Sequence, residues 1–182
     1  LRALRQLEEE GLPKISSAGL AERYRFSAAQ IRKDFASLGD FGIRGVGYDV
    51  AHVAARLGTL LGLDRPHPVL VAGIGNLGSA LARHIGFTSK PFHVAAIVDT
   101  DPQKIGRRIG TVVVRGPRDL RKLVRETAVQ IAILTVPAAA ASETYLALVA
   151  AGIRAVLNFT PVRLEPLPHV KVKQVDLRIL IE

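Results

Sequence analysis

The feature that most constrains this chain is a glycine motif set between a β-rich run and a helical one. Residues 69–72 lead into Gly73, Gly75 and Gly78, spaced as G-x-G-x-x-G, and residues 79–83 continue as a helix. The first glycine permits a tight turn, the second lets the backbone approach a pyrophosphate, and the third permits close helix-to-strand contact. The motif predicts a dinucleotide-binding turn, with a purely structural glycine turn as the alternative. The predicted contacts are Gly73, Gly75, Asn76, Leu77 and Gly78.

An acidic residue stands where a dinucleotide-binding turn needs one. The β-rich run 94–98 ends in Asp99, 21 residues after Gly78. A carboxylate at this place accepts hydrogen bonds from the adenosine ribose hydroxyls and repels a 2′-phosphate, so the sequence predicts NADH or NAD as the cofactor. Asp101, which precedes Pro102, is explained more simply as the cap of a short helix.

Two later strand ends are expected to border the same crevice, because ligands of open parallel sheets lie beyond the carboxyl ends of the strands. At the second of them, Asn158 and Thr160 suit a nicotinamide amide, and Phe159 can form an apolar wall. Capped strand-to-helix turns would use the same residues. The residues predicted near the nicotinamide are Thr135, Val136, Pro137, Asn158 and Phe159.

The pattern around these residues predicts the fold class. Residues 1–63 are helical in pattern with short breaks, and two prolines, Pro66 and Pro68, forbid a continuous helix beyond them. From there on, strands alternate with helices, which is typical of a parallel, Rossmann-like α/β sheet covered by helices. The strands are expected near 69–73, 92–98, 111–114, 129–135 and 154–157, and the helices near 76–85, 117–126 and 138–151. The last helix has a proline in its first turn and ends at Gly152.

The N-terminal third predicts two helices that meet across a tight turn. Ser16 and Ser17 are suited to cap the first, and Ser27 is suited to cap the second, over 28–38. Apolar residues recur at helical spacing along the second helix, so its opposite face points outward. Basic and amide side chains on that face suit phosphates and base edges of DNA, although an ordinary solvated face would carry the same residues. The predicted DNA contacts are Gln30, Arg32, Lys33 and Ser37.

A glycine-rich segment follows the second helix. Gly42, Gly45 and Gly47 surround Arg44, which predicts a tight β-turn with the arginine at its tip. Such a basic wing can place an arginine in a narrow minor groove. A plain hairpin leading to a helix capped by Asp49 is the alternative. We expect Arg44 and Gly45 to contact DNA.

The net charge of +9 favours a polyanionic partner but does not locate its site. Residues 1–50 carry 8 basic and 7 acidic side chains, whereas residues 51–182 carry 17 and 9. The densest basic run, which extends from Lys104 to Arg125, is better explained as a solvated helix face than as a phosphate-binding patch.

Several classes of function are excluded by composition. The chain has no cysteine, which excludes disulfides and thiol chemistry and fits a reducing cytoplasm, and its five histidines are scattered, so no metal is expected. No apolar run is long enough to span a membrane. No acid–base pair is evident, and the residues after Asn158 are too few for a substrate domain, so we expect a protein that is not an enzyme. A small NAD-dependent oxidoreductase and a CoA-binding domain are the alternatives.

With these residues in view, the chain resembles the Rex family of redox-sensing transcriptional repressors, which join a winged helix to a Rossmann domain. The resemblance implies a homodimer that binds operator DNA and leaves it when NADH binds. It also implies a winged-helix domain over 1–63, a Rossmann domain over 64–175, and at 176–182 the truncated start of a helix exchanged between subunits. The resemblance rests on the runs 30–35, 41–48, 73–81, 98–102, 134–137 and 157–161.

Two positions depart from the pattern of that family. Members commonly have a glycine between the two DNA-binding helices, where this chain has Arg25, and a left-handed backbone at an arginine would cost about 1 kcal/mol. Arg83 and His84 occupy the place where members often have a tyrosine near the nicotinamide.

Overall fold

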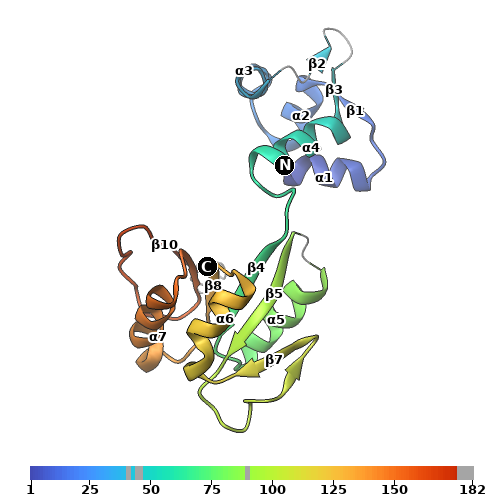
Figure 1. Cartoon of the computed structure of the whole chain (residues 1–182). Coiled ribbons are helices and arrows are strands. Elements are labelled where there is room, and N and C mark those ends of the chain that lie inside the picture. The colour runs from blue at the N-terminus through green and yellow to red at the C-terminus, as the bar shows by residue number, and fades with distance from the viewer. Residues whose placement is uncertain (40–41, 44–46, 89–90, 176–182) are drawn as a thin grey trace. The chain divides into compact units, whose positions relative to one another are not determined.

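A computed structural model of the chain describes residues 1–39, 42–43, 47–88 and 91–175 (Figure 1). The chain divides into two compact units, the first from Leu1 to Arg65 and the second beginning at Pro66. The division therefore lies in the proline-containing segment that precedes the first strand of the larger sheet. None of the helices in the described ranges is both long and apolar enough to cross a membrane.

The first unit combines short helices with a small antiparallel sheet. Its strands are β1 (Lys14–Ile15), β2 (Gly42–Ile43) and β3 (Gly47–Asp49), in the order β1-β3-β2. Its helices are α1 (Arg2–Glu9), α2 (Ser17–Tyr24), α3 (Ala28–Leu38) and α4 (Val50–Leu60). Residues of all four helices and of β1 form one buried core. The helix pair α2–α3, whose second helix carries the predicted DNA contacts, packs on this core. That core contains Leu4, Leu7, Ile15, Leu20, Ile31, Val50, Val53 and Ala54.

Side-chain caps fix where α2, α3 and α4 begin. The Ser16 hydroxyl accepts a hydrogen bond from the Gly19 N–H at 2.9 Å, and Ser27 accepts one from the Gln30 N–H at 3.4 Å. Asp49 caps α4 in the same way, as predicted, through the His52 N–H at 2.9 Å. Ser17 does not cap α2 but is its first helical residue, because Ser16 already has the extended backbone of a cap.

The turn between α2 and α3 has the left-handed backbone considered for it. Arg25 has φ 57° and ψ 41° and ends α2, with its N–H bonded to the Ala21 carbonyl. The turn therefore keeps the geometry that glycine favours, and the arginine carries the conformational cost.

The second unit is a seven-stranded sheet with the order β10-β9-β8-β4-β5-β7-β6. All its neighbouring strands are parallel except the β6–β7 pair. Its strands are β4 (His67–Ala72), β5 (Phe92–Val98), β6 (Arg108–Ile109), β7 (Val112–Arg115), β8 (Ile131–Leu134), β9 (Ala155–Asn158) and β10 (Lys171–Gln174). Its helices are α5 (Asn76–Thr88), α6 (Leu120–Thr127) and α7 (Ala138–Ala151), with a 3-10 turn, η1 (Pro117–Asp119), before α6.

Strands β6 and β10 were not predicted. β6 has two residues, and β10 alternates lysine and glutamine with valine at an edge of the sheet, so neither forms the apolar run that marks a buried strand. The fold class, a winged helix followed by a Rossmann-like parallel sheet, is confirmed.

Helices cover both faces of the sheet, and the glycine motif directly follows its central strand, β4. Leu70 and Ala72 of β4 face the core beneath α6 and α7, whereas Val69 and Val71 face the core beneath α5. β4 lies between β8 and β5, so its carboxyl end is the point where the chain order reverses. Ligands of doubly wound sheets bind at this switch point.

Two details of the helix ends differ from expectation. Pro137 is the cap residue before α7 rather than part of its first turn, because its extended ψ of 152° is not helical. Asp101 precedes a run of turns over 102–106 rather than a short helix, and its carboxylate accepts a hydrogen bond from the Gln103 N–H at 2.9 Å. Gly152 ends α7 with φ 113°, as its sequence position predicted.

Candidate dinucleotide and DNA sites

The glycine turn, residues 73–78, places its three glycines in different surroundings. Gly73 has φ 93°, which favours glycine, and is buried. A β-carbon at Gly78 would lie 1.9 Å from the Gly73 carbonyl oxygen and 2.7 Å from the Thr135 hydroxyl. A β-carbon at Gly75 would meet nothing within 4 Å, and Gly75 is exposed. The first and third glycines therefore close the turn, and the second leaves open space above the backbone.

Helix α5 begins at this open side of the turn. Asn76, its first residue, is exposed, Leu77 is half-buried, and the Ser79 N–H bonds to the Gly75 carbonyl at 2.9 Å. The N–H groups of a helix's first turn have no partner within the helix and carry its partial positive charge. The turn can therefore bind a pyrophosphate through backbone amides.

Asp99 follows β5 and is held against the glycine turn. One carboxylate oxygen, Oδ2, accepts a hydrogen bond from the Ile74 N–H at 2.6 Å, and Oδ1 accepts one from the Asp101 N–H at 2.8 Å. Only 9% of the side chain is exposed. A carboxylate oxygen has two acceptor positions, so both oxygens keep capacity for ribose hydroxyls.

Lys104 pairs with both acids of this segment. Its Nζ lies 3.6 Å from Asp99 Oδ2 and 3.4 Å from Asp101 Oδ2. The Gln103 N–H, and after it the Lys104 ammonium, lowers the pKa of Asp101 below its ordinary value. In the sequence, Lys104 belongs to a basic run expected to be solvated, and its pairing with the two acids was not predicted. A lysine three residues after an aspartate in a turn is the signal that was available.

Thr135, which follows the neighbouring strand β8, supports the glycine turn through hydrogen bonds. Its hydroxyl is shared between the Ala72 carbonyl at 3.1 Å and the Gly73 carbonyl at 2.8 Å. Val136 lies beside the same turn, since its Cγ1 is 3.0 Å from the place of a β-carbon on Gly73, and Pro137 is exposed. The structure brings Thr135 and Val136 to the turn. The contact of all three residues with a nicotinamide stays a prediction.

Asn158 is fully buried and is committed to the protein itself. Its amide nitrogen donates to the Val162 carbonyl at 2.8 Å and to Gln174 Oε1 at 2.7 Å, and its oxygen accepts from the Thr160 N–H at 3.0 Å. Both amide hydrogens are therefore used, which is at odds with the predicted nicotinamide contact through this side chain. A contact through its backbone stays a prediction.

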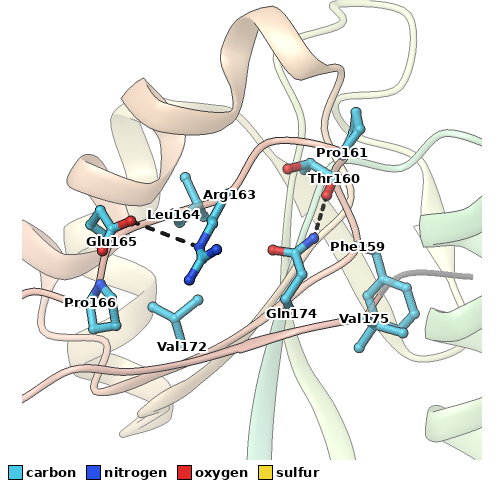
Figure 2. A pocket seen from close by; sticks show the side chains of 10 residues that line it. All are labelled: Phe159, Thr160, Pro161, Arg163, Leu164, Glu165, Pro166, Val172, Gln174 and Val175. Atoms are coloured by element: carbon cyan, nitrogen blue, oxygen red, sulfur yellow. Dashed lines mark hydrogen bonds and ion pairs between the residues drawn. The ribbon is translucent and has the colours of Figure 1, made fainter. Parts of the chain in front are cut away.

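A cavity of about 580 Å³ lies beside this network, between the ends of β9 and β10 (Figure 2). Gln174 lines the cavity, and its side-chain amide donates a hydrogen bond to the Thr160 carbonyl at 2.7 Å. Phe159 is the one predicted cofactor residue among those that line it, and the glycine turn is not part of it. The lining residues are Phe159, Thr160, Pro161, Arg163, Leu164, Glu165, Pro166, Val172, Gln174 and Val175.

In the first unit, the predicted DNA-binding side chains of α3 are all exposed. Gln30 bonds to Asp34 at 2.5 Å, Arg32 bonds to the Ser17 hydroxyl at 3.0 Å, and the Ser37 hydroxyl bonds to the Asp34 carbonyl at 2.7 Å. Lys33 is exposed on the same helix. The predicted wing residues Arg44 and Gly45 lie outside the described residues.

Contacts on the inner side of α3 hold it against the small sheet. Ile31 is buried, and the ring of Phe35 meets Tyr48 of β3 edge-on with centroids 4.8 Å apart. The outer face therefore stands on a fixed helix, and its side chains can exchange internal hydrogen bonds for contacts with a nucleic acid.

The basic run of the second unit is spread over several elements rather than one helix. Arg118, Arg121, Lys122 and Arg125 lie on or beside α6 and are exposed, with Lys122 4.0 Å from Glu126. The rest of the run lies in turns and strands. No group of three or more potential metal ligands occurs in the part of the chain that the structure describes.

Known proteins resemble both units of the chain. Residues 64–162 belong to the family described as CoA binding domain, and residues 1–36 match the family described as putative DNA-binding protein N-terminus. The chain is 42% identical over 182 residues to the redox-sensing transcriptional repressor Rex of Streptomyces coelicolor, covering 100% of this chain and 70% of that protein. It is 42% identical over 175 residues to Rex of Chloroflexus aggregans, covering 96% and 82%. The chain belongs to the Rex family of redox-sensing transcriptional repressors.

Solved structures of a Rex-family repressor agree over nearly the whole chain. The crystal structure of RSP in complex with β-NAD⁺ and operator DNA matches with a TM-score of 0.91 at 33% identity, covering 99% of this chain and 83% of that one. The crystal structure of RSP in complex with β-NADH matches with a TM-score of 0.86 at 32% identity, covering 99% and 84%. The predicted family is confirmed, and Rex relatives are repressors rather than enzymes.

Proposed function

We propose that this chain is a transcriptional repressor that binds operator DNA through its first unit and NADH or NAD through its second. The observation that carries the proposal is the Asp99 carboxylate, which is bonded to the Ile74 N–H beside a turn that is open above Gly75. This arrangement offers amides to a pyrophosphate and a carboxylate to the neighbouring ribose.

The cofactor would extend from Asp99 across the glycine turn. The amides of residues 75–78 would bind the pyrophosphate, and Gly73 and Gly78 would keep the turn closed beneath it. The end of the neighbouring strand β8 supports a nicotinamide site beyond the turn, because Thr135, which follows β8, is hydrogen-bonded to the turn itself. The residues proposed for that end are Thr135, Val136, Pro137, Phe159 and the backbone of Asn158.

Operator DNA would meet the exposed face of α3 and the wing. Arginine and lysine neutralise phosphates or reach guanine, and glutamine pairs with adenine, so the face suits a major groove. The proposed contacts are Gln30, Arg32, Lys33, Ser37, Arg44 and Gly45. We further propose that the protein acts in the cytoplasm as a homodimer, because two recognition helices read two half-sites.

The two ligands would be coupled through one protein. NADH would weaken operator binding and NAD would leave it intact, in keeping with a family described as redox-sensing. Coupling between two binding sites is reciprocal, so operator DNA would weaken NADH binding by the same factor.

Operator gel shifts at fixed salt test this function. NADH is expected to raise the dissociation constant of the operator complex at least about fivefold, a typical lower limit for coupling between sites, and NAD is not. If neither form changes operator affinity, the switch is wrong even where both ligands bind.

An Asp99→Arg variant identifies the cofactor site. It is expected to lower NADH affinity by at least about tenfold, because the diol partner is lost and a hydrogen-bond acceptor of the turn disappears. Operator binding without cofactor is expected to stay at the wild-type value. Loss of the NADH effect with operator binding retained supports the assignment, and unchanged NADH affinity contradicts it.

Coenzyme A is the second candidate ligand, favoured by the CoA binding domain family to which residues 64–162 belong. Its nucleotide carries a 3′-phosphate, which Asp99 would repel in the same way as a 2′-phosphate. Competition between coenzyme A and NADH separates the two: displacement of NADH by equimolar coenzyme A would favour the second candidate.

A further inference from the structure

We propose that Lys104 is a specificity-determining residue that limits how strongly the site rejects NADPH relative to NADH. The inference rests on the proposed function, since it concerns the ribose end of the same site. Its basis is the lysine's double contact, 3.6 Å from Asp99 Oδ2 and 3.4 Å from Asp101 Oδ2.

The lysine is held in place by the backbone around it. The Lys104 and Ile105 N–H groups both bond to the Asp101 carbonyl, at 3.0 and 3.1 Å, and the Arg107 N–H bonds to the Lys104 carbonyl at 3.0 Å. The Gly106 N–H then ties the turn to β7 through the Val114 carbonyl at 2.9 Å. The backbone of Lys104 is therefore fixed in the loop, and the two ion pairs direct its ammonium to Asp99 and Asp101.

The net charge of the loop determines how the Lys104 ammonium affects cofactor binding. Asp99 and Asp101 bring two negative charges to one loop, and Lys104 offsets one of them. A ribose hydroxyl bound to Asp99 needs an acceptor and is little affected by the balance, whereas a 2′-phosphate brings about two negative charges to the same oxygens. Its binding therefore depends steeply on the nearest positive charge.

Burial strengthens the effect at this place. The Asp99 side chain is 9% exposed and that of Lys104 is 33% exposed, so solvent screens their field less than it screens Lys122 of α6, which is 66% exposed. The lysine can turn from Asp101, the more exposed acid at 38%, toward a phosphate without leaving Asp99.

Two substitutions should move the preference in opposite directions. Lys104→Ala leaves two unshielded carboxylates, and NADPH affinity is expected to fall about tenfold while NADH affinity falls less than about threefold. Asp101→Asn removes the competing carboxylate but keeps the side-chain oxygen that accepts from the Gln103 N–H. It is expected to raise NADPH affinity about threefold to tenfold relative to NADH. General damage to the site cannot produce opposite signs.

The experiment titrates the 182-residue chain and its variants with NADH by fluorescence, and measures NADPH by displacement of bound NADH, which reaches weak affinities. Lys122→Ala is the matched control, because that lysine also pairs with one acid, Glu126, but lies on α6. Lys104→Arg keeps the charge and is expected to retain the wild-type ratio. Thermal melts establish that each variant is folded.

The outcomes separate this inference from the proposed function. If the wild-type chain binds no NADH, the proposed function fails, and this inference with it. If the wild-type chain binds NADH but the NADPH-to-NADH ratio moves less than about twofold in both Lys104→Ala and Asp101→Asn, Lys104 is a structural residue of the turn and only this inference is overturned. A shift as large in Lys122→Ala would show a general charge effect and would overturn it too.

Discussion

The two units of this molecule build their candidate sites from different parts of the chain. In the second unit the site is mainly backbone: a partly buried turn in which Gly73 and Gly78 approach other atoms closely, with one carboxylate hydrogen-bonded to it. In the first unit the site consists of exposed side chains on α3, a helix that packs on the core through other residues such as Ile31. A backbone site is therefore tied to its fold, whereas a side-chain site can change while its fold persists.

The largest effect is expected where the backbone site has no free space. Gly78→Ala places a β-carbon 1.9 Å from the Gly73 carbonyl oxygen, so the turn must open. We expect the second unit to lose about 3 kcal/mol of unfolding free energy, the upper range for overpacking, together with NADH binding. Chemical denaturation measures the first quantity and calorimetric titration the second.

Gly75→Ala is the control for that prediction, because a β-carbon there meets nothing within 4 Å. Its stability should stay within about 1 kcal/mol of wild type while NADH affinity falls, since the added methyl occupies the side from which a pyrophosphate approaches. Equal stability of the two variants would show that Gly78 is not sterically required.

The next largest effect tests whether Asn158 is a structural residue. Asn158→Leu leaves the Val162 carbonyl, the Gln174 amide and the Thr160 N–H without their partner. A loss of about 2 kcal/mol is expected, the usual cost of unsatisfied buried groups. Denaturation of this variant beside Gln103→Leu, at an exposed turn position, provides the measurement. If Asn158→Leu has the unfolding free energy of wild type, the Asn158 side chain is not required for stability, and a cofactor contact through it is again the better explanation.

A smaller effect is expected for a DNA-binding side chain of the first unit. Lys33→Ala should weaken binding to all DNA sequences by about threefold to tenfold and reduce the salt slope by about 1, as expected when one phosphate contact is lost, with no change in stability. Binding isotherms at several salt concentrations measure it. Arg125→Ala, an equal change of charge on α6, is the control and should leave the slope at its wild-type value.

The smallest effect concerns the turn that positions α3. Arg25→Gly relieves a left-handed backbone at φ 57° but adds freedom to the unfolded chain, and the two terms leave a gain of about 0.5 kcal/mol. Arg25→Ala keeps the strained backbone and should bring no gain. Urea denaturation distinguishes them, and a gain in Arg25→Ala equal to that in Arg25→Gly would show that backbone strain is not the cause.

Patterns within short stretches of sequence predicted most of the fold. Strand and helix alternation placed β4, β5, β7, β8 and β9, because buried strands of a parallel sheet need continuous apolar runs. The strands β6 and β10 escaped because both lie at edges of the sheet, where polar residues are tolerated, and because β6 has only two residues.

The sequence by itself determined the glycine turn, the acid that follows the next strand and the caps of α2, α3 and α4, since each depends on spacing along one local segment. Only the tertiary structure decided where Asn158 and Lys104 direct their polar groups. Asn158 meets Gln174 across 16 residues because β9 and β10 pair in register, and Lys104 meets Asp99 because a turn folds back on the end of β5. Such contacts depend on how separate segments pack, and neither segment carries that information alone.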